Sequence, residues 1–234
     1  MNGPLVLLPG MMCDARLFAP QQASFNGEVE VIVPTLDGAG SMAELAALVL
    51  AGLPDQFALG GVSMGGILSM EIMRQAANRV THLALIDTNP YAEREDVRLR
   101  RGPQMEAVKA GKLKSVMRDE MKPNYFTHRH DSQALQDLCM EMALNLGVDA
   151  FVSQSLALRD RPDYEDVLRA VSCPSLILCG RHDVLCPVQR HQDMHAMIPH
   201  SRLVIIEEAG HLPTIEEPDR VTQALRDLLE LHHG

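Results

Sequence analysis

The chain has 234 residues, which is enough for a single domain with a full hydrophobic core. Hydrophobic residues make up 46% of it, and no segment is of low complexity, so the composition is typical of a folded globular protein. Aspartate and glutamate outnumber lysine and arginine by 31 to 21, which gives a formal net charge of -10. Because nucleic-acid-binding proteins need a basic face, nucleic acid is not an expected partner.

The N-terminus and the cysteines predict a cytoplasmic protein. The first residues lack the basic segment and the long apolar core of a signal peptide. Their apolar run is interrupted at Pro9 and Gly10, too early for a membrane span. The cysteines are odd in number, with no C-x-x-C spacing, so we expect free thiols rather than disulfides or a zinc site.

Short apolar runs alternate with helical patterns at the start of the chain. The predicted strands are 5–8, 29–33, 57–59 and 83–86, and the predicted helices between them are 42–52 and 67–78. Strands separated by helices indicate right-handed βαβ units. We therefore expect an α/β fold whose mostly parallel sheet has helices on both faces.

Residues 91–172 interrupt this alternation with helical patterns alone, and strand patterns return at 175–179 and 203–206. The helical patterns cover 94–110, 113–121, 132–146, 149–158 and 164–171. Helices should end or kink at Gly102-Pro103, Pro123-Asn124, Gly147 and Pro162. The simplest division places an α/β core in 1–90 and 173–234 and an inserted helical cap, or lid, in 91–172.

Ser63 lies in Gly61-Val62-Ser63-Met64-Gly65, between a predicted strand and a predicted helix. A G-x-S-x-G sequence at such a junction is typical of a nucleophile elbow, a sharp turn that exposes a reactive serine. The backbone is strained there, so the residues two before and two after the serine must be small, as Gly61 and Gly65 are. The alternative is a glycine-rich turn with an incidental serine, and partner residues must decide.

Two later loops carry the partners that a nucleophilic serine requires. Its hydroxyl needs a histidine base, oriented by a carboxylate. In the elbow arrangement the acid and then the histidine follow the serine along the chain, on loops after later strands. Asp183 follows the strand at 175–179, and His211 follows the strand at 203–206. Both lie where this order requires them.

These motifs resemble those of α/β-hydrolase-fold enzymes of the cofactor-free serine esterase type, from the first strand to the last helix. That family uses G-x-x-D-x-x-x-P after one strand and G-H-x-P after the next, and both forms occur here around Asp183 and His211. The resemblance implies an α/β-hydrolase fold, a triad of Ser63, Asp183 and His211, and no cofactor.

The resemblance also implies an oxyanion hole made of the backbone N–H groups of Met11 and Met64. We expect Gly10 and Met12, on the loop after the first strand, to contact the substrate. Relatives often have His-Gly where this chain has Pro9-Gly10, a change that leaves main-chain donors in place. An ordinary strand-end turn is the alternative interpretation.

Other candidate residues are weaker. Asp87 follows the strand after the nucleophile, where some relatives place their acid, and is the best alternative to Asp183. His182 shares a turn with Asp183, which should aim its ring elsewhere. No metal site is predicted, since the two remaining histidine pairs lack a zinc pattern: His191 and His195 share a helix face, and His128 and His130 lie in a polar loop.

Ser63 narrows the expected chemistry, because haloalkane dehalogenases and epoxide hydrolases have an aspartate at that position. The prediction is a carboxylesterase-like serine hydrolase that cleaves a small ester or thioester through a covalent acyl-enzyme. The alternatives are an enol-lactonase, carbon–carbon bond hydrolase or lyase with the same triad, and a non-catalytic binding protein. Basic residues exceed acidic ones in 94–122, which suits an anionic substrate or simply a solvated helix face. The oligomeric state cannot be read from this sequence.

Overall fold

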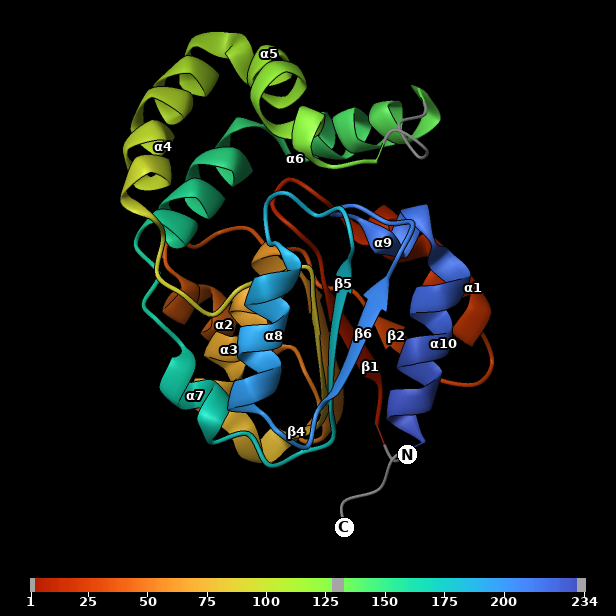
Figure 1. The fold of residues 1–234 in the computed structure, drawn as a ribbon. Coiled ribbons are helices and arrows are strands. Elements are labelled where there is room, and N and C mark those ends of the chain that lie inside the picture. The colour runs from red at the N-terminus through yellow and green to blue at the C-terminus, as the bar shows by residue number, and fades with distance from the viewer. Residues whose placement is uncertain (1–2, 128–132, 231–234) are drawn as a thin grey trace.

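The computed structural model describes residues 3–127 and 133–230, and it contains one six-stranded sheet (Figure 1). All neighbouring strands are parallel. The central strands are almost entirely buried, which explains why they are continuous apolar runs in the sequence. The predicted α/β class is confirmed. In spatial order the strands are β2 (Val31–Ile32), β1 (Leu5–Leu8), β3 (Phe57–Val62), β4 (Val80–Ile86), β5 (Ser175–Gly180) and β6 (Arg202–Ile206).

Helices cover both faces of the sheet (Figure 1). Helices α1 (Ala19–Phe25) and α10 (Pro218–Leu229) lie on one face, and α2 (Met42–Ala51), α3 (Met64–Ala76) and α8 (Val188–Met197) lie on the other. Side chains alternate between the two faces of a strand. Accordingly, Leu5 and Leu7 of β1 enter one hydrophobic core, whereas Val6 and Leu8 enter the other.

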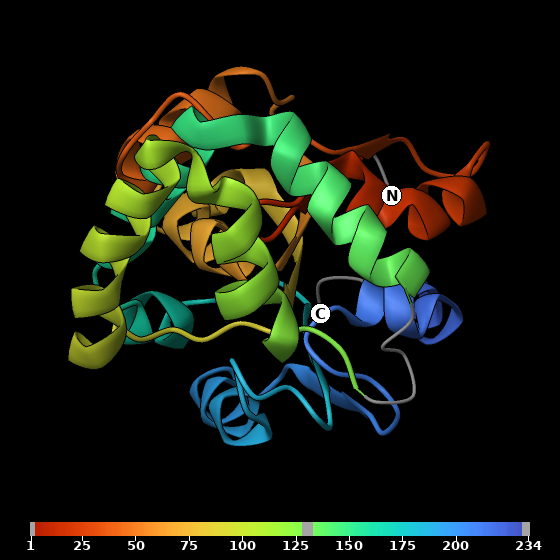
Figure 2. The same cartoon turned by 90° about the horizontal axis from the view of Figure 1, so that it is seen from above.

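Between β4 and β5, the residues that the structure describes form helices and no strand. They form α4 (Glu95–Ala107), α5 (Leu113–Val116), α6 (Gln133–Arg159) and α7 (Glu165–Arg169). Helices α4 to α6 lie above the carboxyl ends of the strands, and in the view from above they lie in front of the sheet (Figure 2). Helix α7 packs against α3 and α8 instead. We propose that α4 to α6 form the cap and that α7 belongs with the core.

Two predicted helix breaks differ in outcome. Gly147 has a φ of 81° and kinks α6, as predicted. The two helices predicted on either side of it meet at this kink and together make up α6. The helix does not end at Gly102-Pro103, one of the two outcomes predicted there, because α4 continues through Pro103. A proline inside a helix removes one backbone hydrogen bond. Burial of Met105 and the contacts of α4 with α6 offset that loss.

The cysteines are all free and all buried. No helix within 3–127 or 133–230 combines the length and the apolar character needed to cross a bilayer. The short helix α9 (Pro213–Glu216) follows the last strand, at the carboxyl edge of the sheet where the predicted site lies.

Candidate active site

Ser63 lies in the turn between β3 and α3, with the strained backbone angles φ 54° and ψ -115°. The flanking glycines make this turn possible. A Cβ on Gly61 would come within 2.2 Å of the Gly65 carbonyl oxygen, and one on Gly65 within 2.0 Å of the Leu8 carbonyl oxygen. Thr88, just after β4, donates a hydrogen bond of 2.8 Å from Oγ1 to the Ser63 carbonyl oxygen. The turn is therefore held by the segment after β4 and lies directly against Leu8 of β1.

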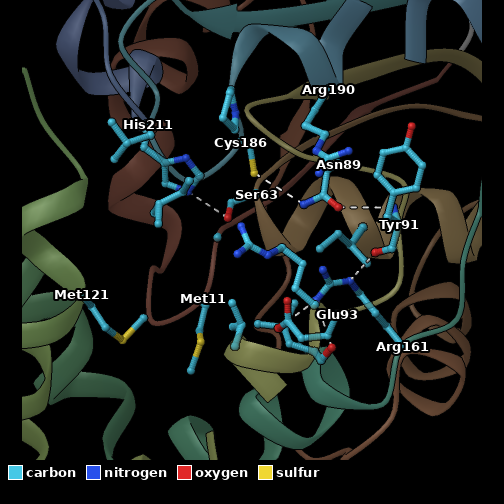
Figure 3. Close-up of a pocket in the computed structure, with 18 of the residues that line it drawn as sticks. Met11, Ser63, Asn89, Tyr91, Glu93, Met121, Arg161, Cys186, Arg190 and His211 are labelled. Atoms are coloured by element: carbon cyan, nitrogen blue, oxygen red, sulfur yellow. Dashed lines mark hydrogen bonds and ion pairs between the residues drawn. The ribbon is translucent and has the colours of Figure 1, made fainter. Parts of the chain in front are cut away.

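His211 connects Ser63 to Asp183. Its Nε2 lies 3.0 Å from Ser63 Oγ (Figure 3). Its Nδ1 lies 2.8 Å from Asp183 Oδ2. Because a carboxylate only accepts hydrogen bonds, we place the proton on Nδ1, which leaves Nε2 to accept the serine proton. The three residues follow β3, β6 and β5, whose carboxyl ends meet at one edge of the sheet. The structure thus brings together all three predicted triad residues.

The Asp183 carboxylate is buried and fully engaged. Its Oδ1 accepts hydrogen bonds from the backbone N–H groups of Leu185 at 2.7 Å and Cys186 at 2.9 Å. Burial by itself would raise the pKa of Asp183, but the neighbouring His211 and hydrogen bonds that include the one from the Cys186 N–H outweigh it and lower the pKa to about 2. Asp183 is therefore ionised at neutral pH.

Asp87, the alternative acid, lies at the end of β4 with a φ of 42°. Its Oδ1 accepts a hydrogen bond of 2.9 Å from the Gly180 N–H rather than from the histidine. Both ring nitrogens of His211 are already occupied by Ser63 and Asp183. This arrangement favours Asp183 over Asp87 as the acid.

The loop that carries His211 is held by residues that sequence reasoning missed. The His211 N–H donates to the Tyr125 carbonyl oxygen at 2.9 Å, from the cap side. The Glu216 carboxylate accepts hydrogen bonds from the N–H groups of Gly210 and Leu212, both at 2.9 Å. Glu216 could have been suspected because it lies five residues after His211, in the short helix that begins at a proline.

The predicted oxyanion donors flank Ser63. Met64 is the first residue of α3, where the N–H groups of the first turn lack carbonyl partners within the helix. Met11 lines the cavity beside Ser63, on a turn closed by a hydrogen bond of 3.1 Å from the Cys13 N–H to the Gly10 carbonyl oxygen. Gly10 also lines the cavity, and a Cβ there would lie 3.5 Å from the Cβ of Ser63.

Met12 lies elsewhere than expected. Its side chain is buried in the hydrophobic core and does not line the cavity. Its backbone N–H donates to Gln154 Oε1 at 2.9 Å, and Gln154 Nε2 donates to the Leu36 carbonyl oxygen at 2.7 Å. The buried Gln154 of α6 therefore ties the loop after β1 to the cap, a contact that joins residues too distant in sequence to be predicted.

Ser63 and His211 open onto a cavity of about 390 Å³ between the sheet edge and the cap. That volume is within the usual range for small-molecule sites. Met11 and Met121 approach it from the core and cap sides (Figure 3). Its apolar wall also includes Ile67, Val97, Leu158 and Leu212.

The other candidate histidines that the structure describes do not line this cavity. His182 is exposed and does not line the cavity. The Nε2 of His191 accepts the Thr88 N–H at 3.1 Å, whereas the Nδ1 of His195 contacts Ser201 Oγ at 2.8 Å, so these two rings serve different partners. His128 and His130 lie outside the described residues.

One group of described residues has the spacing of metal ligands. Donor atoms of Asp183, Cys186 and His211 all lie within 4.8 Å of one another. Asp183 and His211 are, however, hydrogen-bonded to each other. Burial raises the pKa of the Cys186 thiol well above its usual range, which disfavours the thiolate that a metal requires. We assign no metal to this group.

The chain is similar over its whole length to known hydrolases. It is 25% identical over 248 residues to the pimeloyl-[acyl-carrier protein] methyl ester esterase of Aliivibrio salmonicida, with 97% of this chain and 92% of that protein covered. It is 24% identical over 253 residues to a putative carbamate hydrolase of Escherichia coli, with 98% and 92% covered. The structure of a thermophilic esterase from Thermogutta terrifontis, solved with malate bound, has a TM-score of 0.92 and 29% identity, with 100% and 92% covered. The Alpha/beta hydrolase family profile matches residues 5–224, and the chain therefore belongs to the alpha/beta hydrolase family.

Proposed function

We propose that this protein is a serine esterase that cleaves a small ester or thioester through Ser63, His211 and Asp183. The observation that carries this proposal is the unbroken hydrogen-bonded path from Ser63 Oγ through His211 to Asp183, at the wall of a cavity of about 390 Å³. Similarity to a methyl ester esterase and to a thermophilic esterase supports ester bonds as the target.

In the acylation step, Ser63 Oγ attacks the carbonyl carbon of the ester while its proton passes to His211 Nε2. Negative charge develops on the carbonyl oxygen, and the N–H groups of Met11 and Met64 are the proposed donors to it. The bond to the leaving group then breaks, and His211 returns the proton to the departing alkoxide or thiolate. The product of this step is an acyl-enzyme on Ser63.

In the deacylation step, water takes the place of the leaving group. His211 accepts a proton from the water, whose oxygen attacks the acyl carbon, and Ser63 is released as a hydroxyl. Asp183 positions the histidine ring and stabilises its cation in both steps, and it stays ionised throughout. Its low pKa, about 2, suits this role.

The proposal is tested with a fluorophosphonate, which forms a covalent bond to an activated serine. We expect labelling at Ser63 that is lost in Ser63→Ala and retained in Ser153→Ala, a serine of α6 that does not line the cavity. On p-nitrophenyl esters of rising chain length, Ser63→Ala and His211→Ala should lower kcat/KM by about 10⁴-fold or more. Folded protein that is neither labelled nor active would favour a non-catalytic binding protein and reject the proposal.

A further inference from the structure

The cavity beside Ser63 is strongly basic in an acidic protein. Among the described residues that line it are five arginines, and the one acidic side chain is Glu93. The whole chain, in contrast, has a net charge of -10. A cleft lined by one sign of charge concentrates ligands of the opposite sign. The arginines are Arg94, Arg100, Arg101, Arg161 and Arg190.

Three of these arginines lie at the outer part of the cavity. The side chains of Arg94 and Arg100 are 72% and 65% exposed, and both pair with Asp96. Arg190 stacks over the Tyr91 ring, with its guanidinium carbon 4.7 Å from the ring centroid. Charges in such exposed positions are screened by water and salt, so they contribute mainly to attraction at a distance.

Arg101 and Arg161 are different, because their side chains are only 12% and 4% exposed and share the carboxylate of Glu93. Figure 3 shows Arg161 beside Glu93. Glu93 Oε2 accepts hydrogen bonds from Arg101 Nε at 2.8 Å and Nη2 at 2.6 Å, and it lies 3.0 Å from Arg161 Nη1. Two buried cations thus face a single anion. An uncompensated buried charge is costly, and burial accordingly lowers the pKa of Arg101 despite its contact with Glu93.

The two guanidinium groups differ in their remaining partners. Arg161 also donates to the carbonyl oxygens of Tyr91 at 2.9 Å and Leu158 at 3.0 Å, so it links the segment after β4 to the end of α6. Arg101 Nη1 donates to Met11 Sδ at 3.6 Å, and a thioether is a weak acceptor. Met11 belongs to the loop after β1 that borders Ser63. Arg101 therefore presents its poorly satisfied donor beside the site of the proposed reaction.

We propose that Arg101 binds a carboxylate of the substrate, so that the ester cleaved at Ser63 carries a free carboxylate on its acyl or its alcohol portion. The inference rests on the proposed esterase function. An anionic oxygen at Arg101 Nη1 would replace a weak thioether contact with a charge-assisted hydrogen bond. It would also neutralise the excess positive charge of the cluster formed by Glu93, Arg101 and Arg161. The cavity volume of about 390 Å³ limits such a substrate to a small ester.

Matched substrates test this inference in a pH-stat assay of acid release. Monomethyl glutarate carries the carboxylate on the acyl portion and is compared with the neutral methyl pentanoate. Acetoxyacetate carries it on the alcohol portion and is compared with the neutral propyl acetate. We expect one of the two anionic esters to exceed its neutral counterpart in kcat/KM by at least about tenfold, and Arg101→Gln to lower that ratio about 10- to 100-fold. The control is Arg98→Gln, which removes a charge from the same helix outside the cavity and should leave the ratio unchanged.

A binding measurement separates this inference from the esterase proposal. Calorimetric titration of Ser63→Ala with monomethyl glutarate and acetoxyacetate should show binding that is weakened at least about tenfold by adding Arg101→Gln, whether or not any ester is cleaved. If Arg101→Gln does not fold, Arg101→Lys keeps the charge, loses the planar fork, and should still lower the ratio severalfold. The inference is overturned if neither anionic ester is preferred and neither is bound, or if the Arg101 variants and Arg98→Gln behave alike.

Discussion

The carboxyl groups of Asp87 and Asp183 are buried neighbours whose pKa values are displaced in opposite directions. Burial and the adjacent Asp183 charge raise the pKa of Asp87 well above its usual range. Burial would also raise the pKa of Asp183, but His211 and the hydrogen bonds to its carboxylate lower it to about 2. When two carboxyl groups lie this close, the negative charge of one disfavours ionisation of the other. The protonated form is therefore favoured at Asp87, whereas Asp183 is the anion at neutral pH.

This division predicts unequal effects of two amide substitutions. Asp183→Asn removes the anion that stabilises the histidine cation and should lower kcat by about 10⁴-fold. Asp87→Asn puts a neutral amide of the same shape where the protonated carboxyl is favoured, and the amide oxygen can still accept the Gly180 N–H, so most of the activity should remain. Steady-state kinetics on a p-nitrophenyl ester compares them. Equal losses in both variants would show that Asp87 shares the anionic role.

His191 makes stability depend on pH. Burial lowers the pKa of His191 to about 4, and its Nε2 must stay unprotonated to accept the Thr88 N–H. The pKa of histidine in an unfolded chain is about 6.5, so the unfolded state binds the proton more tightly. The contribution of His191 to the free energy of unfolding is therefore fully present above pH about 6.5. It is lost as the pH falls toward 4, by up to about 3 kcal/mol.

Urea denaturation of wild type and His191→Gln between pH 8 and pH 4 measures this contribution. The difference between the two free energies of unfolding should shrink as the pH falls, because glutamine can accept the Thr88 N–H at every pH. Subtracting one free energy of unfolding from the other at each pH removes the pH dependence that Asp87 and Asp183 contribute to both proteins. A difference that is constant across the range would mean that His191 does not titrate in this way.

The parts of the site that could be predicted from the sequence are those set by local geometry. Gly61 and Gly65 flank Ser63 because the turn allows no Cβ at either position, and Asp183 and His211 each follow a strand that the apolar pattern marks. The strand limits were less predictable. The strand predicted at 29–33 is reduced to Val31–Ile32, because this edge strand pairs with β1 over two residues only.

The contacts that depend on tertiary packing could not be predicted in this way. Glu93 and Arg101 lie eight residues apart, before and within α4, but Arg161 follows α6, and only the packing of the cap brings it to them. Helix α4 continues through Pro103 for the same reason, since contacts outside the helix compensate for one missing hydrogen bond. The sequence pattern marks the nucleophile and its partners but not the shape of the cavity that selects the substrate.

The stability of the protein should depend on the absence of a side chain at Gly65. A Cβ on Gly65 would lie 2.0 Å from the Leu8 carbonyl oxygen, a backbone atom that cannot move without displacing β1. Gly65→Ala should therefore destabilise the protein by several kcal/mol, as overpacking of a rigid site does. Gly52→Ala is the control, because Gly52 is exposed with a φ of -94°, a Cβ there meets only the Val49 carbonyl oxygen at 3.8 Å, and alanine at a compatible φ stabilises a protein by about 0.4–1 kcal/mol. Thermal unfolding should show a lower Tm for the first variant and a higher Tm for the second.

The side-chain amide of Gln154 joins the Met12 N–H to the Leu36 carbonyl oxygen inside the protein. Gln154→Ala leaves both groups buried without this partner and should cost about 1–3 kcal/mol of stability. It also frees the loop that holds Met11, so the oxyanion donor is less well placed and kcat should fall by about tenfold or more. Gln133→Ala, which removes an exposed glutamine at the start of the same helix, should change neither quantity. A loss of stability with kcat intact would place the Met11 N–H outside the oxyanion hole, because a donor that acts in the transition state must be sensitive to the loop that carries it.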